Sequence, residues 1–168
     1  MGHYERVKYA DGPTVQVEMV VEAPVDVVWS LVTDISLPAR FSTEFCGATW
    51  IDPPALGARF HGRSRHDALG EWETVSFVSR YESPKAFAWD VGDPDNPSAS
   101  WWFELHEQTP GVLVRYGARI GPAPSGLSIA ITAMPDKEER IIARRLQEFE
   151  RNMTATLQGV KALAEGAR

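Results

Sequence analysis

The sequence has only one cysteine, Cys46, among its 168 residues. A single cysteine cannot form an intrachain disulfide, so this is not a disulfide-stapled secreted domain, and it fits a reducing cytoplasm. Because Cys46 is isolated after a phenylalanine, we expect a small buried apolar side chain rather than a nucleophile. No apolar run approaches the roughly 18 residues of a membrane span, and residues 1–11 are polar rather than signal-like. The prediction is a cytoplasmic protein without a membrane span.

Basic residues are also few. Lys and Arg number 17 against 23 Asp and Glu, which gives a formal net charge of -6. Nucleic-acid binding needs a basic stripe, and the nearest candidate, Arg59, Arg63 and Arg65, alternates along a predicted strand as one solvated sheet face does. The sequence therefore predicts no nucleic-acid partner.

Familiar catalytic and cofactor motifs are missing from the sequence. It has no Gly-x-Ser-x-Gly elbow, no Walker loop and no dinucleotide-binding glycine loop. His61 and His66 are an odd number of residues apart on one predicted strand, so they face opposite sides, and no His, Asp or Glu cluster has the spacing of metal ligands. We expect neither a metal nor a cofactor.

The composition that remains is that of one ordinary globular domain, with 43% hydrophobic and 24% charged residues. Residues 1–13 lack periodicity and end in Asp-Gly-Pro, which predicts an N-terminal arm closed by a turn. We expect a single domain over residues 14–168.

The longest periodic segment is Asp136–Glu165, in which apolar residues recur at steps of three or four. This spacing predicts one long helix with an apolar stripe. The stripe consists of Ile142, Leu146, Phe149, Met153, Leu157, Val160 and Ala164. The charged residues between them, including Arg145 and Glu148, are expected on the solvated face of the helix, where i, i+4 pairs link them.

Before this helix the sequence predicts one strand, two short helical segments and six further strands. The first strand is Val15–Glu22, and the helical segments are Asp26–Asp34 and Ser36–Phe41. The six strands have period two and are Thr49–Asp52, Ala58–His66, Glu71–Tyr81, Phe87–Val91, Ala99–His106 and Val112–Ile120. Short Pro- and Gly-rich turns separate them, so neighbours are antiparallel. The fold class is α+β, with helices on one side of an antiparallel sheet.

A strongly curved sheet around the long helix leaves a space that inward side chains line. Parity along Glu71–Tyr81 is ambiguous, because one set of alternating residues competes with another: Trp72, Thr74, Ser76 and Val78 against Val75, Phe77 and Tyr81. We favour the first set inward, with a possible bulge. With six Trp and seven Phe in the chain, the aromatic residues favour a ligand pocket over plain core packing. Trp29 is assigned to the core. The predicted ligand-binding residues are Phe41, Phe60, Ser64, His66, Trp72, Ser76, Trp89, Trp101, Phe103, Tyr116, Phe149 and Met153.

The order of elements, together with several motifs, resembles the START-like or SRPBCC superfamily, most closely its polyketide cyclase/dehydrase-like group of small bacterial proteins. The motifs are Val20-Val-Glu-Ala-Pro-Val-Asp-Val-Val-Trp29, Gly57-Ala-Arg-Phe-His-Gly-Arg63, Trp72-Glu-Thr, Phe87-Ala-Trp-Asp-Val91 and the final helix. The resemblance implies a helix-grip (Bet v 1-like) fold, in which a curved antiparallel sheet of about seven strands wraps round the C-terminal helix. It also implies a deep hydrophobic cavity that works without a cofactor.

Three functions are compatible with this resemblance. The first is binding of a small hydrophobic molecule, polyketide-, lipid- or sterol-like, in the cavity. The second is a cyclase or dehydratase in which His66 or Tyr116 moves protons. The third is a co-chaperone-like interaction module that uses the outer sheet face. Whether the chain is a monomer or a homodimer stays open.

The segment between the last strand and the long helix, Gly121–Pro135, reads as a linker rich in Pro, Ser and Gly. Within it, Leu127–Met134 is apolar and bounded by Pro and Gly. We expect this run to lie over the mouth of the cavity, where a mobile lid controls entry.

Overall fold

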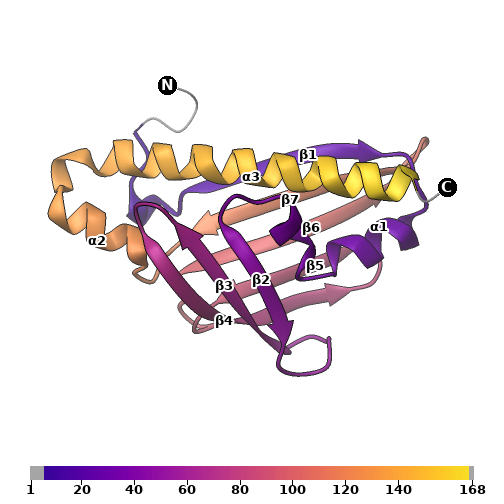
Figure 1. The fold of residues 1–168 in the computed structure, drawn as a ribbon, viewed down its shortest axis with the longest axis horizontal. Helices are drawn as coiled ribbons and strands as arrows, with labels where there is room; N and C mark the ends of the chain where they lie inside the picture. Colours follow the sequence, from indigo (N-terminus) through magenta and orange to yellow (C-terminus); the bar gives the residue numbers. More distant parts are fainter. Residues whose placement is uncertain (1–5, 167–168) are drawn as a thin grey trace.

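The sheet has seven antiparallel strands in the order β1-β7-β6-β5-β4-β3-β2 in the computed structural model, which describes residues 6–166. The strands are β1 Thr14–Val21, β2 Phe45–Trp50, β3 Arg59–His66, β4 Gly70–Glu82, β5 Ala86–Val91, β6 Ala99–Glu107 and β7 Val112–Ile120. Strands β2 to β7 form a meander, and β1 closes the sheet by pairing with β7. The predicted α+β helix-grip fold is confirmed (Figure 1).

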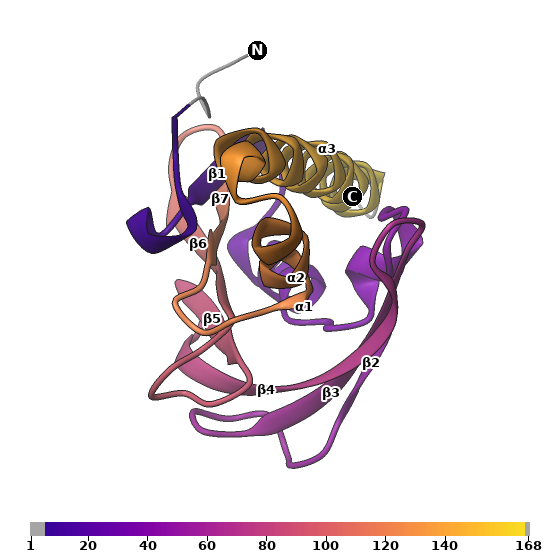
Figure 2. The same ribbon diagram turned by 90° about the vertical axis from the view of Figure 1, so that its left-hand side faces the viewer.

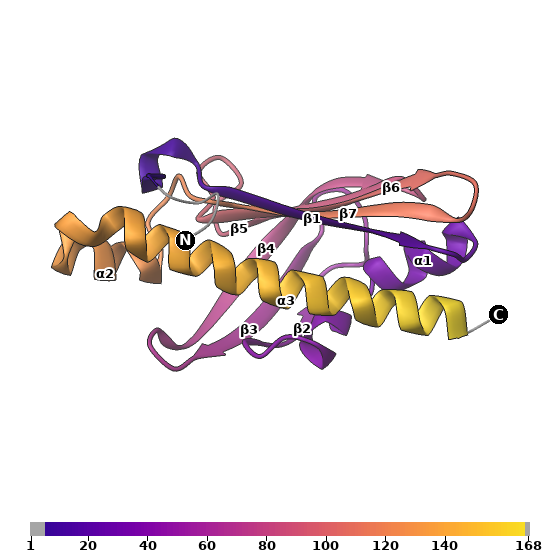
Figure 3. The same cartoon turned by 90° about the horizontal axis from the view of Figure 1, so that it is seen from above.

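Three α-helices accompany the sheet: α1 Val25–Val32, α2 Gly126–Ala133 and α3 Glu138–Gly166. Short 3-10 turns occupy Tyr9–Asp11, Leu37–Arg40 and Pro135–Lys137. Helix α3 packs along β1, and all seven residues of its predicted apolar stripe are buried. Figure 3 shows α3 running the length of the molecule beside β1. None of the helices in residues 6–166 is both long enough and apolar enough to span a membrane.

The sheet is strongly curved. Figure 2 shows β1 and β7 beside α3, β4 and β5 farthest from it, and β2 and β3 curving back toward it. A continuous antiparallel sheet achieves this because its strands twist and because bulges interrupt two of its pairings. The concave face therefore surrounds a space that α3 closes on one side.

Helix α2 was not predicted, because Gly121–Pro135 reads as a linker. Pro122 and Pro124 suggest a loop, and the isoleucines of the helix lower its intrinsic propensity. The helix begins where Ser128 Oγ accepts a hydrogen bond of 3.0 Å from the backbone N–H of Ser125, its N-cap residue. This short-range signal was present in the sequence.

Strand β2 begins at Phe45, four residues before the predicted start. A register shift between Phe45 and Gly47 marks a bulge, and Gly47 has a φ of 136°. The bulge breaks the alternation of side chains, and Cys46 is exposed there. The expectation that Cys46 is buried is therefore wrong.

The predicted N-terminal arm is only partly visible, since residues 1–5 lie outside the described residues. Tyr9 ties the rest of the arm to the start of the last two helices. Its hydroxyl donates to the carbonyl of Ala123, and its backbone N–H donates to a carboxylate oxygen of Glu138 at 2.8 Å. The arm thus packs where the chain leaves the sheet.

Candidate ligand-binding cavity

A cavity of about 400 Å³ lies between the concave face of the sheet, α3 and the start of α2. Its wall contains ten of the twelve predicted ligand-binding residues: Phe60, Ser64, Trp72, Ser76, Trp89, Trp101, Phe103, Tyr116, Phe149 and Met153. Phe41 and His66 lie outside this lining. The alternation of inward and outward side chains along the strands therefore predicted most of the cavity lining. The two predicted residues outside the lining, Phe41 and His66, lie at the ends of secondary-structure elements.

Aromatic side chains form the floor of the cavity. Trp89 of β5 and Trp101 of β6 are register partners, and their rings stack at 6.4 Å with an interplanar angle of 9°. Trp101 also meets Phe149 of α3 at 5.0 Å, which connects the floor to the helix. The floor is therefore apolar and aromatic.

The parity of β4 follows the set that we favoured. Trp72, Thr74 and Ser76 line the cavity, and Val78 is buried on the same face. A register shift between Val78 and Arg80 then turns the strand, so that Tyr81 also faces inward and contacts Phe87 at 5.9 Å. The two competing sets were each correct on one side of the bulge.

Two buried hydroxyl groups in the cavity wall have no hydrogen-bond partner among the described residues. Tyr116 is 5% exposed and Ser76 is 2% exposed, yet neither side chain forms a hydrogen bond with any described residue. No fully enclosed side-chain nitrogen or oxygen in residues 6–166 lacks a partner, so both hydroxyls reach the cavity space. Burial raises the pKa of Tyr116, so its hydroxyl keeps its proton and remains a donor.

Gly62 of β3 leaves room in the same wall. It is buried and lines the cavity, and a Cβ placed there would meet Thr74 Oγ1 at 3.4 Å and a ring carbon of Phe45 at 3.6 Å. Any larger side chain at this position would extend into the cavity.

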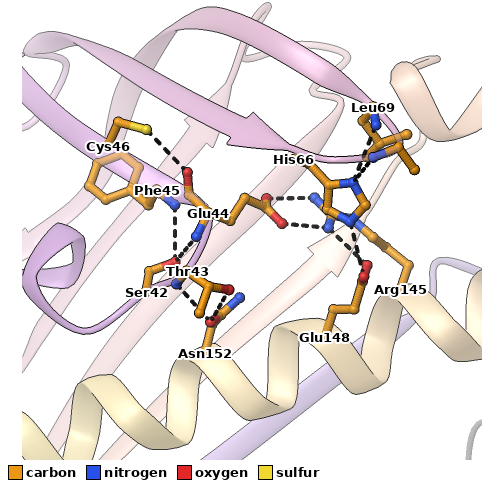
Figure 4. Close-up of polar contacts among 11 residues, drawn as sticks. Ser42, Thr43, Glu44, Phe45, Cys46, His66, Leu69, Arg145, Glu148 and Asn152 are labelled. Carbon is orange, nitrogen blue, oxygen red and sulfur yellow. Dashed lines mark hydrogen bonds and ion pairs between the residues drawn. The ribbon is translucent and has the colours of Figure 1, made fainter.

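Four ionisable side chains join α3 to the β2 and β3 side of the sheet, and we call them the clasp: Glu44, His66, Arg145 and Glu148. Arg145 donates to both carboxylate oxygens of Glu44 at 2.6 and 2.7 Å, and to Glu148 at 3.2 Å. His66 Nε2 lies 2.9 Å from Glu148 Oε2 (Figure 4). The guanidinium carbon of Arg145 also lies 4.5 Å from the centre of the Phe149 ring.

The clasp corrects the prediction that Arg145 is solvated, because Arg145 is only 7% exposed. Burial is the largest single effect and lowers the pKa of Arg145, but the hydrogen bonds and negative charges of Glu44 and Glu148 together outweigh it and keep the pKa above the ordinary value. Burial likewise raises the pKa of Glu148, but hydrogen bonds from His66 and Arg145 together leave it below the ordinary value. Arg145 and Glu148 therefore form an ion pair at neutral pH.

His66 is fully engaged within the clasp. Its Nδ1 accepts hydrogen bonds from the backbone N–H groups of Ala68 and Leu69 at 3.0 and 3.2 Å. A ring nitrogen that accepts carries no proton, so Nε2 is the protonated nitrogen and donates to Glu148. His66 thus closes the β3–β4 turn and holds α3, with no nitrogen directed at the cavity.

Phe41 has a packing role farther along α3, toward its C-terminus. Its ring lies so close to Gly159 that a Cβ on this residue would overlap the ring. This contact packs the 3-10 turn Leu37–Arg40 against α3. Phe41 fixes the position of the chain that leads to Glu44.

The predicted lid segment includes α2. Leu127 is 6% exposed and lines the cavity together with Ser125 and Gly126, whereas Ile129 is 76% exposed. Ile131 is half-buried against the core. The segment therefore lies at the cavity, and its movement as a lid stays a prediction.

Among residues 6–166, no group of three or more His, Cys, Asp or Glu side chains is placed to hold a metal ion. The fold and the cavity define a class of protein: a helix-grip domain with an apolar pocket between a curved sheet and its C-terminal helix. The chain belongs to the family described as polyketide cyclase / dehydrase and lipid transport, whose model matches residues 13–165. This confirms the resemblance to polyketide cyclase-like SRPBCC proteins.

Solved structures with low sequence identity share the fold. The Polyketide_cyc-like protein Cgl2372 from Corynebacterium glutamicum is 24% identical, with a TM-score of 0.66 and 92% of each chain covered. The di-domain ARO/CYC BexL from the BE-7585A biosynthetic pathway is 14% identical with a TM-score of 0.69, and the match covers 90% of this chain and 50% of BexL. TTHA0849 from Thermus thermophilus is 13% identical with a TM-score of 0.65, over 92% and 99% of the two chains. A comparison with curated proteins found no match.

Proposed function

We propose that the protein binds a small hydrophobic molecule, polyketide-, lipid- or sterol-like, in the cavity between the sheet and α3. The observation that carries this proposal is an aromatic-walled space of about 400 Å³ with hydroxyl groups that no described residue satisfies. Small-molecule sites are typically apolar pockets of about 300–1,000 Å³ with a few polar groups that orient the ligand. Membership of a family named for cyclases and lipid transport supports the same function.

A cyclase or dehydratase is the second candidate, and the Tyr116 hydroxyl in the cavity wall is what favours it. A protonated Tyr116 can donate a proton or a hydrogen bond to a carbonyl. Such a reaction also needs a base, and the other ionisable side chains of the lining are Asp34, Glu44 and Arg145. Glu44 is held by Arg145, and Asp34 is exposed at the rim. The interior thus suits binding better than proton abstraction.

Filling the cavity tests the binding function. Ser76→Trp places a large ring in the space, whereas Ser79→Trp places the same ring on the exposed face of the same strand. We expect the wild type and Ser79→Trp to show equal thermal shifts with neutral lipids and polyphenols, and Ser76→Trp to lose them. Equal shifts in all three proteins would show that the compounds bind elsewhere and would contradict the proposal.

A further inference from the structure

Tyr116 is held in a fixed position at the β7 side of the cavity. Its ring stacks on Phe103 at 4.0 Å with an interplanar angle of 15°, and lies 5.9 Å from Trp101. A buried ring packed in this way cannot turn its hydroxyl toward solvent. The hydroxyl therefore has a fixed position in the cavity wall, and no described residue forms a hydrogen bond with it. A bound molecule that places an oxygen there gains a hydrogen bond.

A second group of hydroxyls lies on the other side of the aromatic floor. Ser64 of β3 and Thr74 and Ser76 of β4 line the cavity, and no described residue accepts from or donates to their side chains. Strands β5 and β6, which carry Trp89 and Trp101, separate this group from Tyr116 of β7, as the order of the strands in Figure 2 shows. The site therefore has an apolar, aromatic middle with hydrogen-bonding groups at both sides.

The charge of the lining disfavours an anion. Arg145 is the one cationic side chain among the described lining residues, and its positive charge is already shared by two carboxylates, those of Glu44 and Glu148. Glu44 and Asp34 add two carboxylates to the lining. A ligand carboxylate beside Arg145 would be a third negative charge around a single cation, so a buried carboxylate would lack a full countercharge, which is strongly unfavourable.

We propose that the cavity is specific for uncharged ring compounds that carry a carbonyl or hydroxyl oxygen beside Tyr116, and that it excludes carboxylates such as free fatty acids. Tyr116 is then the residue that selects for the oxygen, and the clasp is the feature that rejects the anion. This inference rests on the proposed ligand binding and adds the chemical class of the ligand.

Three naphthalene probes of nearly equal shape test the inference: acetylnaphthalene, isopropylnaphthalene and naphthoate. They differ in one substituent: the acetyl group is a neutral hydrogen-bond acceptor, the isopropyl group is a hydrocarbon, and the carboxylate is an anion. Affinities are measured by isothermal titration calorimetry at neutral pH for wild type, Tyr116→Phe and Tyr81→Phe. Tyr81 is the matched control, because it lies on the same concave face but outside the cavity lining.

We expect Tyr116→Phe to weaken acetylnaphthalene by about 3- to 10-fold, the effect of one hydrogen bond, and to leave isopropylnaphthalene within about twofold. Tyr81→Phe should change neither affinity. Naphthoate should bind wild type at least about tenfold more weakly than acetylnaphthalene, because its charge has no free partner. Naphthoate binding as tightly as the ketone, or an equal loss of both neutral probes in Tyr116→Phe, would overturn the inference.

The variant Ser76→Trp separates this inference from the proposed function. If it abolishes binding of both neutral probes while Tyr116→Phe has no selective effect, the cavity binds ligands but Tyr116 does not select them. If it leaves both affinities unchanged, the probes do not occupy the cavity, and the proposed function fails together with the inference. If none of the three probes binds to the wild type, the result contradicts both the proposed function and the inference.

Discussion

Single side chains decide how the cavity is held closed, and Glu148 is the clearest case. Its carboxylate accepts hydrogen bonds from Arg145 and from His66, and Arg145 also binds Glu44. Together these contacts hold the pKa of Glu148 below the ordinary glutamate value of 4.5, despite the opposing effect of burial. The ionised carboxylate therefore stabilises the folded protein more than the unfolded chain.

This shift predicts a pH dependence of stability. Because the folded-state pKa is lowered, the stabilisation from Glu148 is fully present above about pH 4.5 and is lost as the pH falls through the folded-state value. Urea denaturation between pH 3 and 7 should show wild type losing more stability below about pH 4.5 than Glu148→Gln, whose side chain does not titrate. Parallel curves for the two proteins would contradict the assignment.

Arg145 has the larger energetic effect, because its charge is nearly enclosed. Removing one partner of a buried ion pair leaves the other charge uncompensated, at a cost of about 3 kcal/mol or more. We expect Arg145→Met to lower the free energy of unfolding by about this amount, and Arg144→Met, one position away and exposed, to change it by less than about 0.5 kcal/mol. Denaturant titration measures both. Similar small changes in the two variants would show that the clasp contributes little.

At the scale of elements, α3 is attached to the sheet in two different ways. Along β1 it packs through its apolar stripe, whereas toward β2 and β3 it is joined by the clasp and by Asn152, whose side-chain oxygen accepts from the backbone N–H of Thr43 at 3.2 Å. Polar contacts of this kind break and reform more readily than a packed core. Helix α3 is thus held by packing on the β1 side and by polar contacts on the β2 and β3 side.

The placement of α2 predicts the effect of a charge on its outer surface. Ile129 is 76% exposed, so Ile129→Asp removes little buried area and should leave the melting temperature within about 2 °C. If α2 closes over a bound ligand, the same change should weaken acetylnaphthalene several-fold, while Ser79→Asp on the outer sheet face should not. Unchanged affinity would show that α2 is a fixed wall rather than a lid.

Local patterns in the sequence predicted the elements that have a clear period. Trp89, Trp101 and Phe103 could be placed inside the sheet because alternation with period two fixes a strand face. The clasp could not be predicted, because Glu44 and Arg145 are 101 residues apart and neither sits in a recognisable motif. Cys46 lies within a bulge and Tyr81 follows one, and in a bulge one extra residue interrupts the alternation of side chains.

For the whole molecule, the curved sheet and α3 enclose a space that packing alone would fill with side chains. Gly62, Ser64 and Ser76 are small residues at inward positions of β3 and β4, and larger apolar residues there would give a solid core. The sequence therefore retains a cavity where stability alone favours none. A retained cavity with unsatisfied hydroxyls is the basis for the proposed binding function.

Native mass spectrometry of the purified protein, followed by solvent extraction, tests this claim most directly. We predict a mass above that of the chain alone, and extraction of an uncharged hydrophobic compound that Ser76→Trp no longer retains. A protein that shows only its own mass, and that gains no mass when incubated with neutral aromatic ketones, would contradict the account.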